Sequence, residues 1–145
     1  MSVVINNIGL LVTNDPSVGG DGLGQIRDAA VVIDGDRIVW VGRCAEAPAA
    51  DYQADMTGAC IIPGFVDSHS HPVFAGDRSD EFDARMNGQK YEAGGILRTV
   101  RRTREASVGL LDAVMTGILD EMALGGTTTV EAKTGYGLDI ETEVK

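Results

Sequence analysis

The fold of this chain is decided by residues 61–71, which read Ile61-Ile62-Pro63-Gly64-Phe65-Val66-Asp67-Ser68-His69-Ser70-His71. Nearly every residue from Ile61 to Val66 is apolar, which is typical of a strand buried on both faces, as in a parallel sheet. His69 and His71 follow directly. Residues two apart on an extended strand point to the same side, so the stretch predicts a buried strand that ends in two converging imidazoles.

These two histidines are the only ones in the chain. Two imidazoles with the Asp67 carboxylate on the same side suit a Zn, Fe, Mn or Ni ion. A His-x-His triplet also arises by chance, and the two rings would then be hydrogen-bonded neighbours in a loop. Barrel enzymes place their catalytic groups at the C-terminal ends of strands, so the position favours a metal site. Catalytic zinc needs three protein ligands, so others must come from carboxylates here or from sequence outside the chain.

Before this stretch, the pattern predicts a small antiparallel β module over residues 1–62. Residues 3–12 form one expected strand, and a second covers residues 59–62. Between them, two β-branched runs flank Asp34-Gly35-Asp36-Arg37, which is a strong hairpin signal.

After the stretch, residues 63–145 predict the first β/α units of an incomplete TIM (β/α)8 barrel. Helices are expected over 94–106 and 107–124, with Ser107 as N-cap and Gly125-Gly126 at the end. The apolar side of the second helix is expected at Leu110, Leu111, Val114, Ile118 and Met122. A strand over 127–130 and a helix from Asp139 complete the order strand, crossover, strand, helix. A full barrel needs about 250 residues, so the chain is expected to be truncated.

Composition narrows the function classes. The chain has 145 residues, 43% hydrophobic and 23% charged, with a net charge of -10, so a nucleic-acid partner is not expected. No apolar run approaches the roughly 20 residues that span a bilayer, and the N-terminus lacks the pattern of a signal peptide. Cys44 and Cys60 are expected as buried free thiols, with a disulfide left open. The predicted location is the cytoplasm.

The motifs resemble a known family. Residues 61–71 are similar to the PGxxDxHxH signature of the amidohydrolase superfamily, and the preceding β module to part of the small sandwich that flanks its barrel. Residues 72–82 (Pro72-Val73-Phe74-Ala75-Gly76-Asp77-Arg78-Ser79-Asp80-Glu81-Phe82) and 129–138 (Thr129-Val130-Glu131-Ala132-Lys133-Thr134-Gly135-Tyr136-Gly137-Leu138) resemble the imidazolonepropionase family. The resemblance covers the whole chain but only about the first third of the family's length.

This resemblance implies metal-dependent hydrolysis of a cyclic amide C–N bond, from 4-imidazolone-5-propanoate to N-formimidoyl-L-glutamate in histidine degradation. It implies one Zn or Fe ion per site, with His69 and His71 as ligands. Arg78, Tyr136 and Tyr91 are the expected substrate-binding residues. The general base and the last two ligands are expected beyond Lys145, and a homodimer is possible for the full-length enzyme.

Several alternatives stay open. Arg78 lies among acidic residues and would otherwise be read as their partner at a solvated helix start, and Tyr136 as a packing residue on the rim. Glu131 and Lys133 are expected to form an ion pair. The chain could belong to another amidohydrolase, such as a cytosine or guanine deaminase, or be a non-catalytic fragment. The isolated polypeptide is expected to bind metal weakly and to show no turnover.

Overall fold

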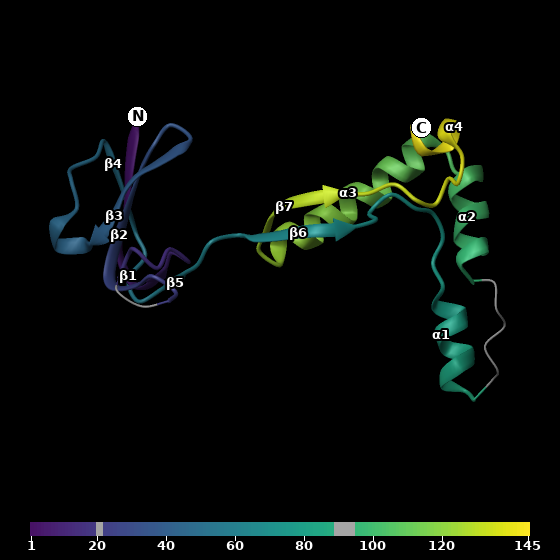
Figure 1. Cartoon of the computed structure of the whole chain (residues 1–145), viewed down its shortest axis with the longest axis horizontal. Coiled ribbons are helices and arrows are strands. Elements are labelled where there is room, and N and C mark those ends of the chain that lie inside the picture. The colour runs from purple at the N-terminus through teal and green to yellow at the C-terminus, as the bar shows by residue number, and fades with distance from the viewer. Residues whose placement is uncertain (20–21, 89–94) are drawn as a thin grey trace. The chain divides into compact units, whose positions relative to one another are not determined.

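The computed structural model describes residues 1–19, 22–88 and 95–145. The chain divides into two compact units, Met1–Pro63 (unit 1) and Gly64–Lys145 (unit 2), each drawn in Figure 1. Within the described residues, no helix is long and apolar enough to cross a membrane.

Unit 1 is built on one five-stranded sheet. Its elements are β1 (Ser2–Val12), β2 (Gln25–Asp34), β3 (Arg37–Arg43), the 3₁₀ turn η1 (Cys44–Glu46), β4 (Tyr52–Asp55) and β5 (Cys60–Ile61). The predicted strand over 3–12 and the hairpin between β2 and β3 are confirmed. Gly35 takes φ +60° in that turn, a conformation that glycine adopts without steric cost.

The prediction of an antiparallel module holds only for β1, β2 and β3. Both β4 and β5 pair with β1 in parallel. The reason is the path of residues 44–51, which cross back from the end of β3 to the start of β1, where Tyr52 pairs with Val3. A strand entered by such a crossover runs in the same direction as its neighbour.

The core of unit 1 occupies both faces of the sheet. Ile8 is fully buried in a cluster with Leu11, Ala29 and Val31. The alternate residues of β2, Ala30 and Val32, pack in a second cluster under Trp40. Cys44 and Cys60 are free thiols as expected, but Cys60 is exposed and Cys44 only partly buried.

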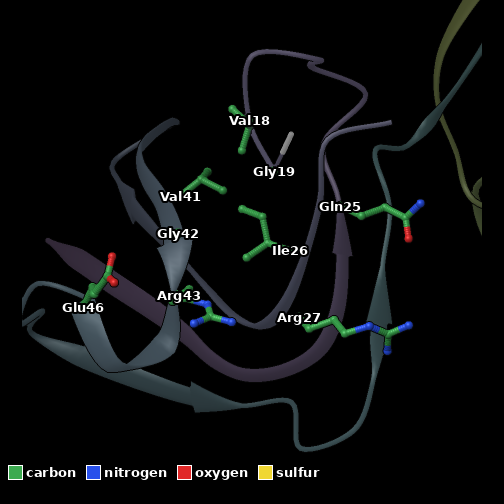
Figure 2. A pocket seen from close by; sticks show the side chains of 9 residues that line it. All are labelled: Val18, Gly19, Gln25, Ile26, Arg27, Val41, Gly42, Arg43 and Glu46. Atoms are coloured by element: carbon green, nitrogen blue, oxygen red, sulfur yellow. The ribbon is translucent and has the colours of Figure 1, made fainter. Parts of the chain in front are cut away.

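A hollow of about 570 Å³ lies on unit 1 (Figure 2). No residue predicted to bind metal or substrate lines it. Its lining residues are Val18, Gly19, Gln25, Ile26, Arg27, Val41, Gly42, Arg43 and Glu46.

Unit 2 has a two-stranded parallel sheet and helices. Its elements are β6 (Phe65–Ser70), α1 (Ser79–Met86), α2 (Gly95–Glu105), α3 (Val108–Leu124), β7 (Thr127–Ala132) and α4 (Ile140–Glu143). The parallel pairing of β6 and β7 confirms the predicted strand, crossover, strand order. The Ser107 hydroxyl accepts the Leu110 N–H at 3.2 Å, which confirms the predicted N-cap of α3.

Two predictions for unit 2 are wrong. The apolar run 61–66 is not one buried strand: Ile61 belongs to the unit 1 sheet, and β6 begins at Phe65. Phe65 and Val66 are 55% and 68% exposed. Parallel sheets are ordinarily covered on both faces, and β6 and β7 make only a two-stranded sheet within the described residues. On α3, Leu111 is buried, whereas Leu110 is 50% exposed and falls outside the buried side.

Candidate metal and substrate site

The site forms where β6 and β7 end. The Lys133 N–H donates to the Ser70 carbonyl at 2.8 Å, so the two C-terminal strand ends lie side by side. His71 leaves this edge from β6, and Tyr136 leaves it from β7. Parallel pairing thus brings together two segments that are far apart in the sequence.

The two histidine rings lie next to each other at this edge, in a T-shaped arrangement. Their centroids are 5.3 Å apart, and the ring planes make an angle of 67°. Two imidazoles bound to one tetrahedral ion through bonds of about 2.0 Å would have centroids roughly 5 Å apart. The His69 and His71 rings therefore have a separation that fits a shared ion.

A buried polar atom also points to a missing partner. Nδ1 of His71 is buried and has no hydrogen-bond partner among the residues that the structure describes. A buried polar group is ordinarily paired, since leaving it unpaired costs free energy. Gly135 passes directly beside this ring: a Cβ there would lie 3.2 Å from Nδ1. The His71 ring is thus packed closely against Gly135, on the side that carries Nδ1.

Asp67 forms hydrogen bonds with the strand end that carries the histidines. Its carboxylate accepts the Ser70 hydroxyl at 2.7 Å and the His69 N–H at 3.0 Å. These bonds hold the pKa of Asp67 below its usual value, the Ser70 bond contributing most. Asp67 therefore fixes the backbone that carries the histidines. Among the described residues, no group of three or more His, Cys, Asp or Glu side chains could hold a metal ion, so no third side chain of these types joins His69 and His71 there.

Tyr136 lies against the histidines. Its ring centroid is 5.8 Å from that of His71 and 5.9 Å from that of Phe74. The structure thus brings together three residues that the sequence singled out, His69, His71 and Tyr136, and adds Phe74. Tyr91, the further substrate-binding candidate, lies outside the described residues.

Arg78 is held by a neighbouring carboxylate. At the N-cap position of α1, its Nε and one terminal nitrogen donate to Glu81 Oε2 at 2.9 and 2.7 Å. The Arg78 side chain is 42% exposed. The alternative reading of Arg78, as the partner of an acid at a helix start, therefore describes this structure. A hollow of about 250 Å³ is lined by Arg78, Glu81, Phe82 and Arg85.

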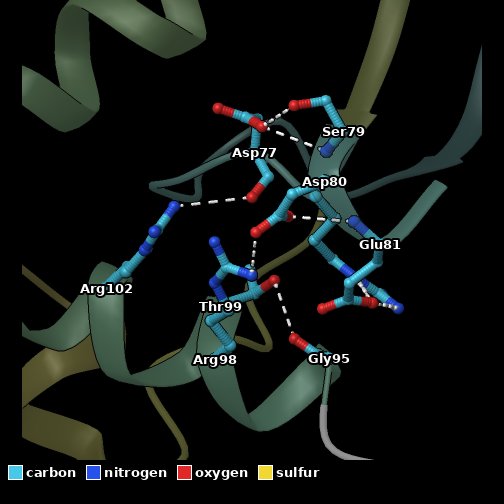
Figure 3. A network of polar contacts seen from close by, with 9 residues as sticks. Asp77, Ser79, Asp80, Glu81, Gly95, Arg98, Thr99 and Arg102 are labelled. Carbon is cyan, nitrogen blue, oxygen red and sulfur yellow. Dashed lines mark hydrogen bonds and ion pairs between the residues drawn. The ribbon is translucent and has the colours of Figure 1, made fainter. Parts of the chain in front are cut away.

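A polar network fixes the segment that carries Arg78 (Figure 3). Arg98 on α2 pairs with Asp80 at 2.6 Å, and Arg102 donates to the Asp77 carbonyl at 3.4 Å. The Arg98 bond is the largest cause that lowers the pKa of Asp80. Sequence reasoning missed these two contacts, because the partners lie 18 and 25 residues earlier in the chain. By contrast, the expected Glu131–Lys133 ion pair is present at 2.6 Å.

Comparison with known proteins shows what the sequence is similar to. No family model matches the chain. It is 86% identical over all 145 residues to imidazolonepropionase of Cutibacterium acnes, of which it spans 37%. It is 57% identical over 138 residues, 94% of the chain, to imidazolonepropionase of Streptomyces coelicolor, of which it spans 35%. The chain thus spans little more than a third of the length of these curated relatives.

Solved structures give the fold. One similar structure is that of atrazine chlorohydrolase from Arthrobacter aurescens TC1, complexed with zinc. The match covers 90% of this chain and 28% of that one, with a TM-score of 0.58 and 23% identity. A second similar structure is that of A. niger ochratoxinase. The match covers 94% of this chain and 26% of that one, with a TM-score of 0.56 and 22% identity. The structural neighbours are amidohydrolases with TIM barrels. Over its whole length, then, the chain corresponds to the N-terminal portion of imidazolonepropionases, as the motifs indicated.

Proposed function

We propose that this chain supplies the N-terminal part of a metal-dependent hydrolase that opens 4-imidazolone-5-propanoate to N-formimidoyl-L-glutamate. The observation that carries the proposal is the cluster of His69, His71 and Tyr136 at the C-terminal edge of two parallel strands. The identity to imidazolonepropionases over the whole chain supports the choice of substrate.

His69 and His71 would hold one zinc or iron ion, since imidazole accepts both. The ring separation fits this role, as does Nδ1 of His71, which has no hydrogen-bond partner within residues 1–19, 22–88 and 95–145. When bound, the ion supplies Lewis acidity and lowers the pKa of a water molecule toward neutrality. Two imidazoles do not complete a catalytic site. The remaining ligands and the general base would come from the part of the relatives that this chain does not cover.

The other residues would bind and orient the substrate. Tyr136 lies beside His71, where its ring and hydroxyl can contact a small planar ring. Arg78 carries a planar guanidinium that suits a propanoate carboxylate. In this structure the guanidinium donates to Glu81. The substrate carboxylate would therefore displace Glu81 or share the guanidinium with it.

The experiment requires a complete enzyme. A chimera in which residues 1–145 replace the matching segment of the Cutibacterium acnes relative provides one, because the two segments are 86% identical. The chimera is expected to hydrolyse imidazolone propanoate and to leave cytosine and guanine unchanged. Turnover of an aminated base in place of imidazolone propanoate would replace the assignment with a deaminase. The 145-residue chain alone is expected to show no turnover.

A further inference from the structure

One carboxylate organises the loop that carries Tyr136. Glu143 Oε1 accepts the backbone N–H groups of Gly137 and Leu138, each at 2.8 Å, and its Oε2 accepts that of Gly135, also at 2.8 Å. Hydrogen bonds between backbone N–H groups and a charged carboxylate are among the stronger ones in proteins. The same bonds, the one from Leu138 first, hold the pKa of Glu143 below its usual value, together with a hydrogen bond from the Thr134 side chain.

This loop has a conformation that needs external support. Leu138 has φ +60°, in the left-handed region that residues with a Cβ avoid. Gly135 has φ +153° and lies so close to His71 that a Cβ would be 3.1 Å from the ring. Both residues donate to Glu143. The bonds to its carboxylate therefore compensate for a backbone that would otherwise relax to another shape.

The helix that carries Glu143 is itself anchored. The Asp139 carboxylate accepts the Thr142 N–H at 2.8 Å, as N-cap of α4, and also pairs with Arg104 at the end of α2. The Lys145 ammonium donates to the Ala106 carbonyl in the α2–α3 connection. Because α4 is fixed to the helices in this way, Glu143 acts as a fixed point for the loop.

We propose that Glu143 is a positioning residue, which holds the Gly135–Leu138 loop so that the Tyr136 ring lies against His71. Its carboxylate is engaged by backbone groups and acts on the site through Tyr136. The consequence for catalysis rests on the proposed function, whereas the role in holding the loop stands on the contacts alone.

The two oxygens of Glu143 have different partners, which allows a sharp test. In Glu143→Gln, the amide oxygen can keep the bonds to Gly137 and Leu138, but the NH₂ group then faces the Gly135 N–H, donor against donor. Amide hydrogen exchange in the chimeric enzyme, resolved by residue through mass spectrometry, is expected to accelerate about tenfold or more at Gly135. Exchange at Gly137 and Leu138 is expected to change less. The matched control is Glu141→Gln, which removes the same charge from an exposed position on α4.

Kinetics provide the second readout. If imidazolone propanoate is the substrate, Glu143→Gln is expected to raise KM several-fold with a smaller change in kcat, in the same direction as Tyr136→Phe. Equal exchange at Gly135 in the two Glu→Gln variants would overturn the proposal. The proposal would also be overturned if Glu143→Gln speeds exchange at Gly135 but leaves the kinetics unchanged, while Tyr136→Phe impairs the enzyme. If no protein turns over imidazolone propanoate, the proposed function fails, while the exchange result still decides the role of Glu143 in the loop.

Discussion

The two units differ in how far they bury their own apolar residues. Unit 1 has clusters on both faces of its sheet, and Ile8 is completely buried. In unit 2, by contrast, Phe65 and Val66 on β6 and Leu124 on α3 are all more than half exposed. Burial of apolar surface is the main favourable term in folding. Unit 1 therefore carries the better-developed core, although every residue placed in the candidate site belongs to unit 2.

This difference separates stability from chemistry. A change in the unit 1 core is expected to affect unfolding, and a change at the strand edge of unit 2 is expected to affect activity. Exposed strands that present unpaired edges and apolar side chains are a hazard for aggregation. Within the described part of unit 2, β6 and β7 pair only with each other, so this unit has more to gain from further cover.

The largest effect is expected from the histidines. His71→Ala in the chimeric enzyme removes one imidazole of the pair and should lower kcat/KM by about 10³-fold or more, since the ion contributes several kcal/mol to catalysis. Metal content per protein, measured on the same samples, should fall in parallel. Ser68→Ala, on the same strand, should leave both unchanged. Normal metal content and turnover in His71→Ala would show that His71 neither binds the ion nor contributes to catalysis.

Arg78 is expected to have the next largest effect. Arg78→Lys keeps the charge but loses the planar fork that matches a carboxylate, so KM for imidazolone propanoate should rise about 10- to 100-fold, as for a lost charged hydrogen bond. The control is Arg101→Lys, at an exposed position on α2. Equal KM values for the two variants would return Arg78 to the role the structure shows, that of a partner for Glu81.

The sequence predicted much of the fold and part of the site, for reasons that particular residues show. Local signals correctly placed the hairpin turn at Gly35 and the start of α3 at Ser107. The parallel pairing of β4 with β1 was not predictable, because it depends on the path of a connection rather than on any pattern.

At the site, His69, His71 and Tyr136 were found through motifs, and the structure brings their rings together. The Glu81 partner of Arg78 was only one of several acids nearby, and local sequence cannot choose among them. Glu143 was missed altogether. A signal did exist, because two glycines and Leu138 in a loop expose N–H groups that need an acceptor. The sequence pattern does not indicate which residue is that acceptor.

Core substitutions test the stability half of the comparison. Ile8→Ala in the 145-residue chain is expected to lower the free energy of unfolding by about 2–5 kcal/mol, the range for removing a large buried aliphatic side chain. Trp40, the single tryptophan, lies in unit 1 and reports its urea unfolding by fluorescence. Val66→Ala in unit 2, at a 68% exposed position, should leave that transition unchanged. A Val66→Ala shift as large as that of Ile8→Ala would show that the units unfold together.

The smallest effect is expected in how the stability of unit 1 depends on pH. The Thr57 hydroxyl, the Asn7 amide and the Thr57 N–H all donate to Asp55 Oδ1 and hold the pKa of Asp55 below its usual value. A depressed folded pKa contributes stability above the unfolded pKa, and this contribution is lost as the pH falls through the folded value.

Asp55→Asn can keep the three bonds but does not titrate. Its unfolding, followed through Trp40, should therefore depend less on pH below about pH 4 than that of the unchanged chain. Because Asp55 is exposed, solvent screens the effect, so identical pH profiles at low ionic strength would rule out a role for this carboxylate in the acid stability of unit 1.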